Sequence, residues 1–264
     1  MKRLHEFIDV EQMHREVCRR LLLTAADCVA SRGCFHLVLA GGATPAPLYQ
    51  QLAQASDIRW PDWHIYFSDE RCLPAGDPAR NDSMARTRWL DHVAIPERQI
   101  HPIAAELGSR QGALDYDRLL QHSPHFDLVL LGLGEDGHTA SLFPEDGETP
   151  TGFTLARPVQ QAPKAPAERV SMTAQCLNRT DRAWFIAAGE HKRDIVTAWL
   201  RGDDMPANRV RGKGGSDILC DRRVAPAPAS TQTGGATSSY KNMVTMPPLP
   251  MPINASSRCL NKPR

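Results

Sequence analysis

A glycine-rich segment in the middle of the chain carries the side chains best suited to chemistry. Residues 131–144 read LGLGEDGHTASLFP, so an acid, Asp136, stands two positions before a histidine, His138. A histidine has an ordinary pKa near ~6.5 and suits proton transfer at neutral pH. A neighbouring carboxylate would fix its tautomer and raise its basicity. We therefore predict that His138 is a general base oriented by Asp136, the alternative being a structural, hydrogen-bonded histidine.

Two other interpretations of this segment are weaker. Residues 132–137 fit the dinucleotide pattern GxGxxG, but Glu135 and Asp136 would place two negative charges against a pyrophosphate. Ser141 suggests a serine nucleophile. It lies only three residues after His138, and the chain has no G-x-S-x-G elbow. We therefore expect neither nucleotide binding nor a serine nucleophile.

A second glycine turn stands between an apolar, strand-like segment and a helical one. Gly41 and Gly42 precede Thr44, which suits a helix N-cap, and Pro45, which suits the first helical position. Free N–H groups and the positive end of a helix favour an anion there. The turn is therefore either a phosphate site or an ordinary capped turn.

Four cationic side chains stand near other expected strand ends. Arg71 follows two carboxylates and could stabilise an oxyanion or bind a carboxylate, unless it belongs to a surface ion-pair cluster. Arg169 and Lys192 could hold a phosphate if they meet the Thr44 turn, although either could be a solvated surface cation. Lys164, in a proline-bounded loop, is a weaker candidate.

The elements that must position these residues alternate between strands and helices. This alternation predicts an α/β fold with a Rossmann-like, doubly wound, mainly parallel sheet and helices on both faces. Parallel strand ends meet at one edge of a sheet, so the candidate residues should gather there. Strands are expected at 35–40, 63–67, 127–131, 169–173, 183–188 and 216–221, and helices at 10–30, 45–52, 82–92, 108–122 and 190–201.

Composition excludes several classes of protein. The chain has 264 residues, 41% hydrophobic and 23% charged, with a net charge of +1, so neither nucleic-acid nor membrane binding is expected. There is no apolar span, no signal core and no CxxC pair among seven cysteines. These features predict a cytoplasmic protein without a metal site. Residues 1–222 should form one domain, and 223–264, rich in proline, serine and alanine, a disordered tail.

Taken together, the motifs resemble the 6-phosphogluconolactonase family, which is related to glucosamine-6-phosphate deaminases. The resemblance covers about residues 5–222, and its most specific part is the segment 132–144. Where family members usually continue into a short acidic helix, this chain instead begins its proline-rich tail after Arg222. The matching segments are 41–45, 68–74, 132–144, 162–166, 169–173 and 188–192.

The resemblance implies an enzyme that hydrolyses 6-phospho-D-glucono-1,5-lactone to 6-phosphogluconate in the oxidative pentose phosphate pathway. It implies a small phosphosugar lactone as the only partner, no metal or organic cofactor, and we expect a monomer. His138 would activate water and Asp136 would orient the His138 ring. Arg71 would stabilise the tetrahedral oxyanion or bind the sugar acid. The residues that would hold the phosphate are Gly41, Gly42, Thr44, Arg169 and Lys192.

Two alternatives stay open. Deaminases resemble this chain at the glycine turn and at 136–138, but they carry Asn-Glu-Pro in place of residues 141–144 and an aromatic residue in place of Arg71. Both differences favour the lactonase. A catalytically silent phosphosugar-binding sensor is the other alternative, against which the intact Asp136 and His138 argue.

Overall fold

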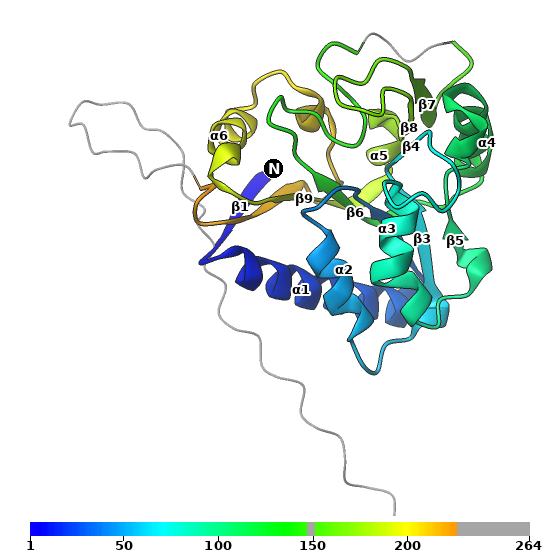
Figure 1. Ribbon diagram of the computed structural model, residues 1–264. Coiled ribbons are helices and arrows are strands. Elements are labelled where there is room, and N and C mark those ends of the chain that lie inside the picture. The colour runs from blue at the N-terminus through cyan, green and yellow to red at the C-terminus, as the bar shows by residue number, and fades with distance from the viewer. Residues whose placement is uncertain (147–150, 226–264) are drawn as a thin grey trace, which may run out of the picture.

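A seven-stranded sheet, parallel throughout, forms the centre of the protein (Figure 1). The computed structural model describes residues 1–146 and 151–225. The strands are β1 (Lys2–Phe7), β2 (Phe35–Leu39), β3 (Trp63–Phe67), β5 (Ile100–His101), β6 (Phe126–Gly132), β9 (Thr180–Ala187) and β10 (Ser216–Asp221). Their order is β1-β10-β9-β6-β2-β3-β5. The predicted doubly wound fold class is therefore confirmed.

A second, antiparallel sheet of three strands stands beside the first. Its order is β4-β8-β7, formed by β4 (Asp69–Arg71), β8 (Arg169–Met172) and β7 (Ala156–Val159). We expected 169–173 among the strands of the main sheet, but this segment pairs instead with β4 and β7. The register sets Arg71 opposite Arg169, so two distant cations are brought together by backbone pairing.

Helices cover both faces of the main sheet. In Figure 1, α1 and α2 lie on one side of it and α6 on the other, while α4 stands against the small sheet. The helices are α1 (Val10–Arg32), α2 (Ala46–Ala53), α3 (Asn81–Arg88), α4 (Ser109–Gln121), α5 (Ala174–Leu177) and α6 (Arg193–Arg201). Short 3-10 turns span Trp60–Asp62, Leu90–His92, Glu97–Gln99, Ala105–Leu107, Glu190–Lys192 and Pro206–Arg209.

Local sequence explains both ends of the longest helix. Helix α1 begins where the Asp9 side chain accepts a hydrogen bond from the Gln12 N–H, and it ends at Gly33, whose φ of 80° favours glycine. The prediction for Thr44 was wrong, because its side chain caps nothing and α2 begins only at Ala46. The Thr44 carbonyl instead meets the buried His14 ring at 2.8 Å.

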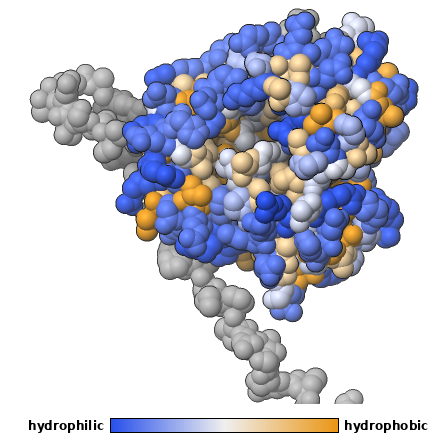
Figure 2. Space-filling view, in the orientation of Figure 1, coloured by the Kyte–Doolittle hydropathy of each residue, from blue (hydrophilic) through white to orange (hydrophobic). Residues whose placement is uncertain are grey.

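Several features lay outside the sequence prediction. Strands β1, β4, β5 and β7 were not expected; β5 is only two residues long, and β1 is half-exposed and mostly polar. Val224, assigned to the tail, is fully buried, and the tail from 226 onward lies outside the described residues. Within 1–146 and 151–225, no helix is long and apolar enough to cross a membrane. The face in Figure 2 is mainly hydrophilic, with hydrophobic residues in small groups. The cytoplasmic location and the monomeric state stay predictions.

Three histidines stack across neighbouring strands of the main sheet. His36 on β2 stacks on His64 of β3 at 4.5 Å between ring centroids, and His101 of β5 stacks on Tyr66 at 4.4 Å. Burial, and then the neighbouring histidines, lower the pKa of His36 and of His101 to about 4. The folded protein therefore keeps these rings neutral at pH values where the unfolded chain takes up protons.

We expect this stack to make folding acid-sensitive. The unfolded rings bind protons as the pH falls through ~6.5, but the folded rings do so only near 4, so stability is complete above 6.5 and is lost toward 4. Urea unfolding between pH 7 and 4.5 should show this decline, and it should be shallower in a His36→Phe variant, which keeps a flat ring. An unchanged slope in that variant would remove His36 from the explanation.

Candidate active site

A cavity of about 320 Å³ opens where β2, β6 and β9 end. Six separate segments of the chain line it. This agrees with the prediction that the candidate residues gather at the edge of the sheet where parallel strands end. Asp136 alone among the predicted site residues lies outside the lining, behind His138. The predicted residues that line it are Gly41, Gly42, Thr44, Arg71, His138, Arg169 and Lys192.

His138 and Asp136 form a tight pair at the edge of this cavity. Their Nδ1 and Oδ1 atoms lie 2.5 Å apart, and the same Oδ1 accepts the His138 backbone N–H at 3.1 Å. Burial by itself would raise the pKa of Asp136, but the hydrogen bonds from His138 outweigh it and lower that pKa. The ring packs on Phe143 at 4.9 Å. Nδ1 is therefore held by the acid, and no described group bonds Nε2.

The glycines of this loop make room for the pair. A Cβ on Gly134 would stand 2.0 Å from His138 Nδ1 and 2.4 Å from Asp136 Oδ1. Gly137 adopts a φ of 83°, and its N–H donates to the Gly134 carbonyl at 3.1 Å. The GxGxxG pattern thus serves a tight turn that presents the histidine, in agreement with the rejection of a pyrophosphate site.

Ser141 is fully buried and lies outside the cavity lining. Its hydroxyl donates to Asp69 Oδ2 at 2.6 Å and accepts a hydrogen bond from Arg169 Nη1 at 3.4 Å. This serine therefore connects the histidine loop to β4 and β8. The geometry supports the earlier preference against a serine nucleophile.

Three further cations line the cavity. Arg169 is buried, and its guanidinium donates to the carbonyls of Pro166 at 3.0 Å and Lys164 at 2.7 Å. Lys192 Nζ lies 3.9 Å from Glu135 Oε1. Burial lowers the pKa of both Arg169 and Lys192, since each charge is partly removed from water. Lys164, the weaker sequence candidate, also lines the cavity. Such desolvated cations favour an anionic ligand.

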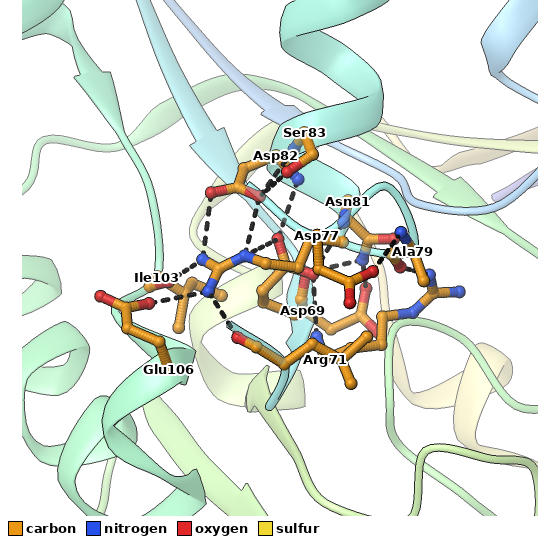
Figure 3. A network of polar contacts seen from close by, with 12 residues as sticks. Asp69, Arg71, Asp77, Ala79, Asn81, Asp82, Ser83, Ile103 and Glu106 are labelled. Carbon is orange, nitrogen blue, oxygen red and sulfur yellow. Dashed lines mark hydrogen bonds and ion pairs between the residues drawn. The ribbon is translucent and has the colours of Figure 1, made fainter. Parts of the chain in front are cut away.

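Arg71 lies at the end of β4 and also lines the cavity. Its Nη1 donates to the Ala79 carbonyl, in the loop that leads to α3, as Figure 3 shows. Its buried Nε has no hydrogen-bond partner among the described residues. The guanidinium therefore has donor capacity left for a ligand.

Among the cavity residues that sequence reasoning missed are an acid and an amide. Asp69 accepts hydrogen bonds from Ser141 and from Asn81 Nδ2, the latter at 3.2 Å. Asn81 is buried at the start of α3, and its amide is so close to Gly41 that a Cβ there would lie 2.1 Å from Asn81 Oδ1. Adjacency to Arg71 could have pointed to Asp69, but nothing local in the sequence marks Asn81.

No metal centre is evident in the described part of the chain. Within 1–146 and 151–225, no group of three or more His, Cys, Asp or Glu side chains is placed to hold a metal ion.

Comparison with known proteins agrees with the geometry. Residues 8–219 match the family model described as glucosamine-6-phosphate isomerases/6-phosphogluconolactonase. The 6-phosphogluconolactonase of Synechocystis is 39% identical over 220 residues, covering 78% of this chain and 89% of that protein. That of Mycobacterium tuberculosis is 35% identical over 223 residues, covering 78% and 90%.

A solved structure supports the same assignment. The 6-phosphogluconolactonase of Thermotoga maritima superposes with a TM-score of 0.78 at 26% identity, covering 84% of this chain and all of that one. The resemblance predicted from the motifs is confirmed: the chain belongs to the glucosamine-6-phosphate isomerase/6-phosphogluconolactonase family.

Proposed function

We propose that the protein hydrolyses 6-phospho-D-glucono-1,5-lactone to 6-phospho-D-gluconate, with His138 as the base that activates water. One observation carries the proposal: a histidine held by an acid opens into the same small cavity as a cluster of partly buried cations. The first can generate a nucleophile, and the second can hold a phosphate. The names of the relatives support the same substrate.

The reaction follows from the contacts of His138. Asp136 accepts a hydrogen bond from the Nδ1–H group of His138, so Nε2 is free to take a proton from water. The resulting hydroxide attacks the lactone carbonyl, and Arg71 stabilises the negative oxygen of the tetrahedral intermediate. When the ring C–O bond breaks, His138 returns its proton to the leaving oxygen. A lactone is an activated ester, so one base and one cation suffice without a cofactor.

The phosphate would be held away from the reacting carbon. Arg169 and Lys192 supply charge, and the backbone of Gly41 and Gly42 with Thr44 supplies N–H donors beside them. Binding at this remote group orients the carbonyl toward His138. Lys164 adds a further cation to the lining of the same cavity.

The direct test is turnover of freshly prepared 6-phosphogluconolactone above its spontaneous hydrolysis in buffer. Release of ammonia from glucosamine 6-phosphate would instead identify a deaminase. Calorimetric binding of 6-phosphogluconate without turnover of either substrate would identify a silent sensor. The lactonase proposal requires the first result and not the other two.

The Lys192→Met variant should lose substrate affinity more than it loses chemistry. Removal of a partly desolvated phosphate partner is expected to raise KM by about 10-fold or more, with kcat reduced less. A Lys192→Arg variant should recover part of the loss. Lys213→Met, which removes a surface lysine 3.7 Å from Asp181, is the matched control and should leave KM unchanged. Equal KM values for Lys192→Met and the unmodified protein would remove Lys192 from the phosphate site.

A further inference from the structure

Arg80 is a buried arginine whose five N–H donors are all used. Nε and Nη2 hold both oxygens of Asp82, at 2.9 and 3.0 Å, and Nη1 meets Glu106 Oε2 at 2.7 Å. The remaining donors go to the carbonyls of Leu73 and Ile103, at 3.1 and 2.9 Å. In Figure 3 these groups converge on one guanidinium, which ties three separate segments together. Only 2% of the residue is exposed.

Glu70 is the second centre of this network and is fully buried. Its carboxylate accepts backbone N–H groups from Arg71 at 2.8 Å, Asn81 at 2.7 Å and Asp82 at 2.8 Å. Two of these N–H groups open helix α3, and the third belongs to the strand that carries Arg71. Its Oε2 also lies 3.9 Å from Arg80 Nε.

The network fixes Arg71 at both ends. Glu70 holds the Arg71 backbone, while the guanidinium of Arg71 donates to the carbonyl of Ala79, the residue next to Arg80. The same carboxylate accepts a hydrogen bond from the backbone N–H of Asn81. The side-chain amide of Asn81 packs closely against Gly41. Two walls of the cavity therefore depend on one buried carboxylate and one buried arginine.

We propose that Glu70 and Arg80 are positioning residues that set the place of the Arg71 guanidinium in the cavity. The proposal rests on the proposed function, in which Arg71 stabilises the oxyanion. Neither side chain reaches the reacting atoms. Each acts through the backbone and loop that carry Arg71, and a displacement of about 1 Å in such a group can cost up to ~100-fold in rate.

A purely structural role makes a different prediction. Buried ion networks often contribute little net stability, and their loss can simply weaken the fold. A structural defect would lower activity by the same factor whether Arg71 is present or absent. A positioning role requires that the effect on catalysis disappear once Arg71 is removed.

The test is therefore a double-mutant cycle. Arg80→Lys keeps the charge but loses the fork of donors. Where Arg71 is intact, Arg80→Lys is expected to lower kcat/KM by about 10- to 100-fold. In the Arg71→Ala background, it is expected to lower kcat/KM by less than about 3-fold. The drop in melting temperature should be the same in both backgrounds. If Arg80→Lys lowered kcat/KM by the same factor with and without Arg71, the proposal would be overturned.

Two further variants keep the test decisive. If Arg80→Lys does not fold, Glu106→Gln is used in the same cycle, because it removes the charge from one half-exposed partner of Arg80. Arg86→Lys is the matched control: this arginine lies on α3, the helix that follows Arg80, and pairs with Glu97, outside the cavity lining. It should leave kcat/KM unchanged.

The cycle separates this proposal from the proposed function. Absence of lactone turnover by the unmodified protein would contradict the function. The same variants are then compared by their calorimetric affinity for 6-phosphogluconate, whose carboxylate Arg71 would bind. The positioning role would be supported if Arg80→Lys lowered this affinity where Arg71 is intact but not in the Arg71→Ala background. Equal losses of affinity in the two backgrounds would overturn it.

Discussion

The His138→Ala variant is expected to lose about 10²- to 10⁴-fold in kcat, because it removes the group that takes the proton from water. Binding should survive, since the substitution leaves the cations of the cavity in place. The rate of 6-phosphogluconolactone hydrolysis must be measured above the spontaneous rate in buffer. Affinity for 6-phosphogluconate, measured by calorimetry, should change by only a few-fold. An unchanged kcat would exclude His138 as the base.

The chain supplies a matched control for this substitution. His125 also pairs with an aspartate, with 3.0 Å between its Nε2 and Asp181 Oδ1, but it stands outside the cavity lining. His125→Ala should therefore keep full activity. Asp136→Asn should lose less than His138→Ala, because the ring remains but its tautomer and orientation are no longer held by a carboxylate. If His125→Ala and His138→Ala lost activity equally, the cause would be damage to the fold rather than removal of the base.

The Gly134→Ala variant is expected to lose 10²-fold or more in kcat/KM while the protein still folds. The added methyl would stand 2.0 Å from His138 Nδ1 and 2.4 Å from Asp136 Oδ1, so the pair must separate or swing away. Backbone strain is not the cause, since Gly134 is not among the glycines with positive φ. A base moved by about 1 Å loses much of its advantage. Kinetics together with urea unfolding would measure both effects.

Gly132→Ala provides the comparison within the same loop. No atom lies within 4 Å of a Cβ at Gly132, although this residue also borders the cavity. Its methyl should cost at most a few-fold in KM and leave kcat near that of the unmodified protein. Similar losses from Gly132→Ala and Gly134→Ala would contradict the steric explanation.

Prediction from sequence succeeded where the controlling interactions are local. The strand at 216–221 was placed at its observed bounds, and α1 begins at Val10 as expected. Prediction failed at Thr44, whose carbonyl is engaged by His14 thirty residues earlier while its side chain caps nothing. A capping preference is worth about 1 kcal/mol, so tertiary contacts easily override it.

The sequence by itself determined the pairing of His138 with Asp136, because two residues on one tight glycine turn have few other places to go. It also determined the parallel sheet, whose buried strands appear as short apolar segments between helices. Only the tertiary structure decided that Arg169 stands opposite Arg71, through an antiparallel sheet that no local pattern marks. It alone placed Asn81 against Gly41 and surrounded Arg80 with partners from distant segments. Those contacts depend on how separate segments cross in space, which the spacing of residues along the chain does not encode.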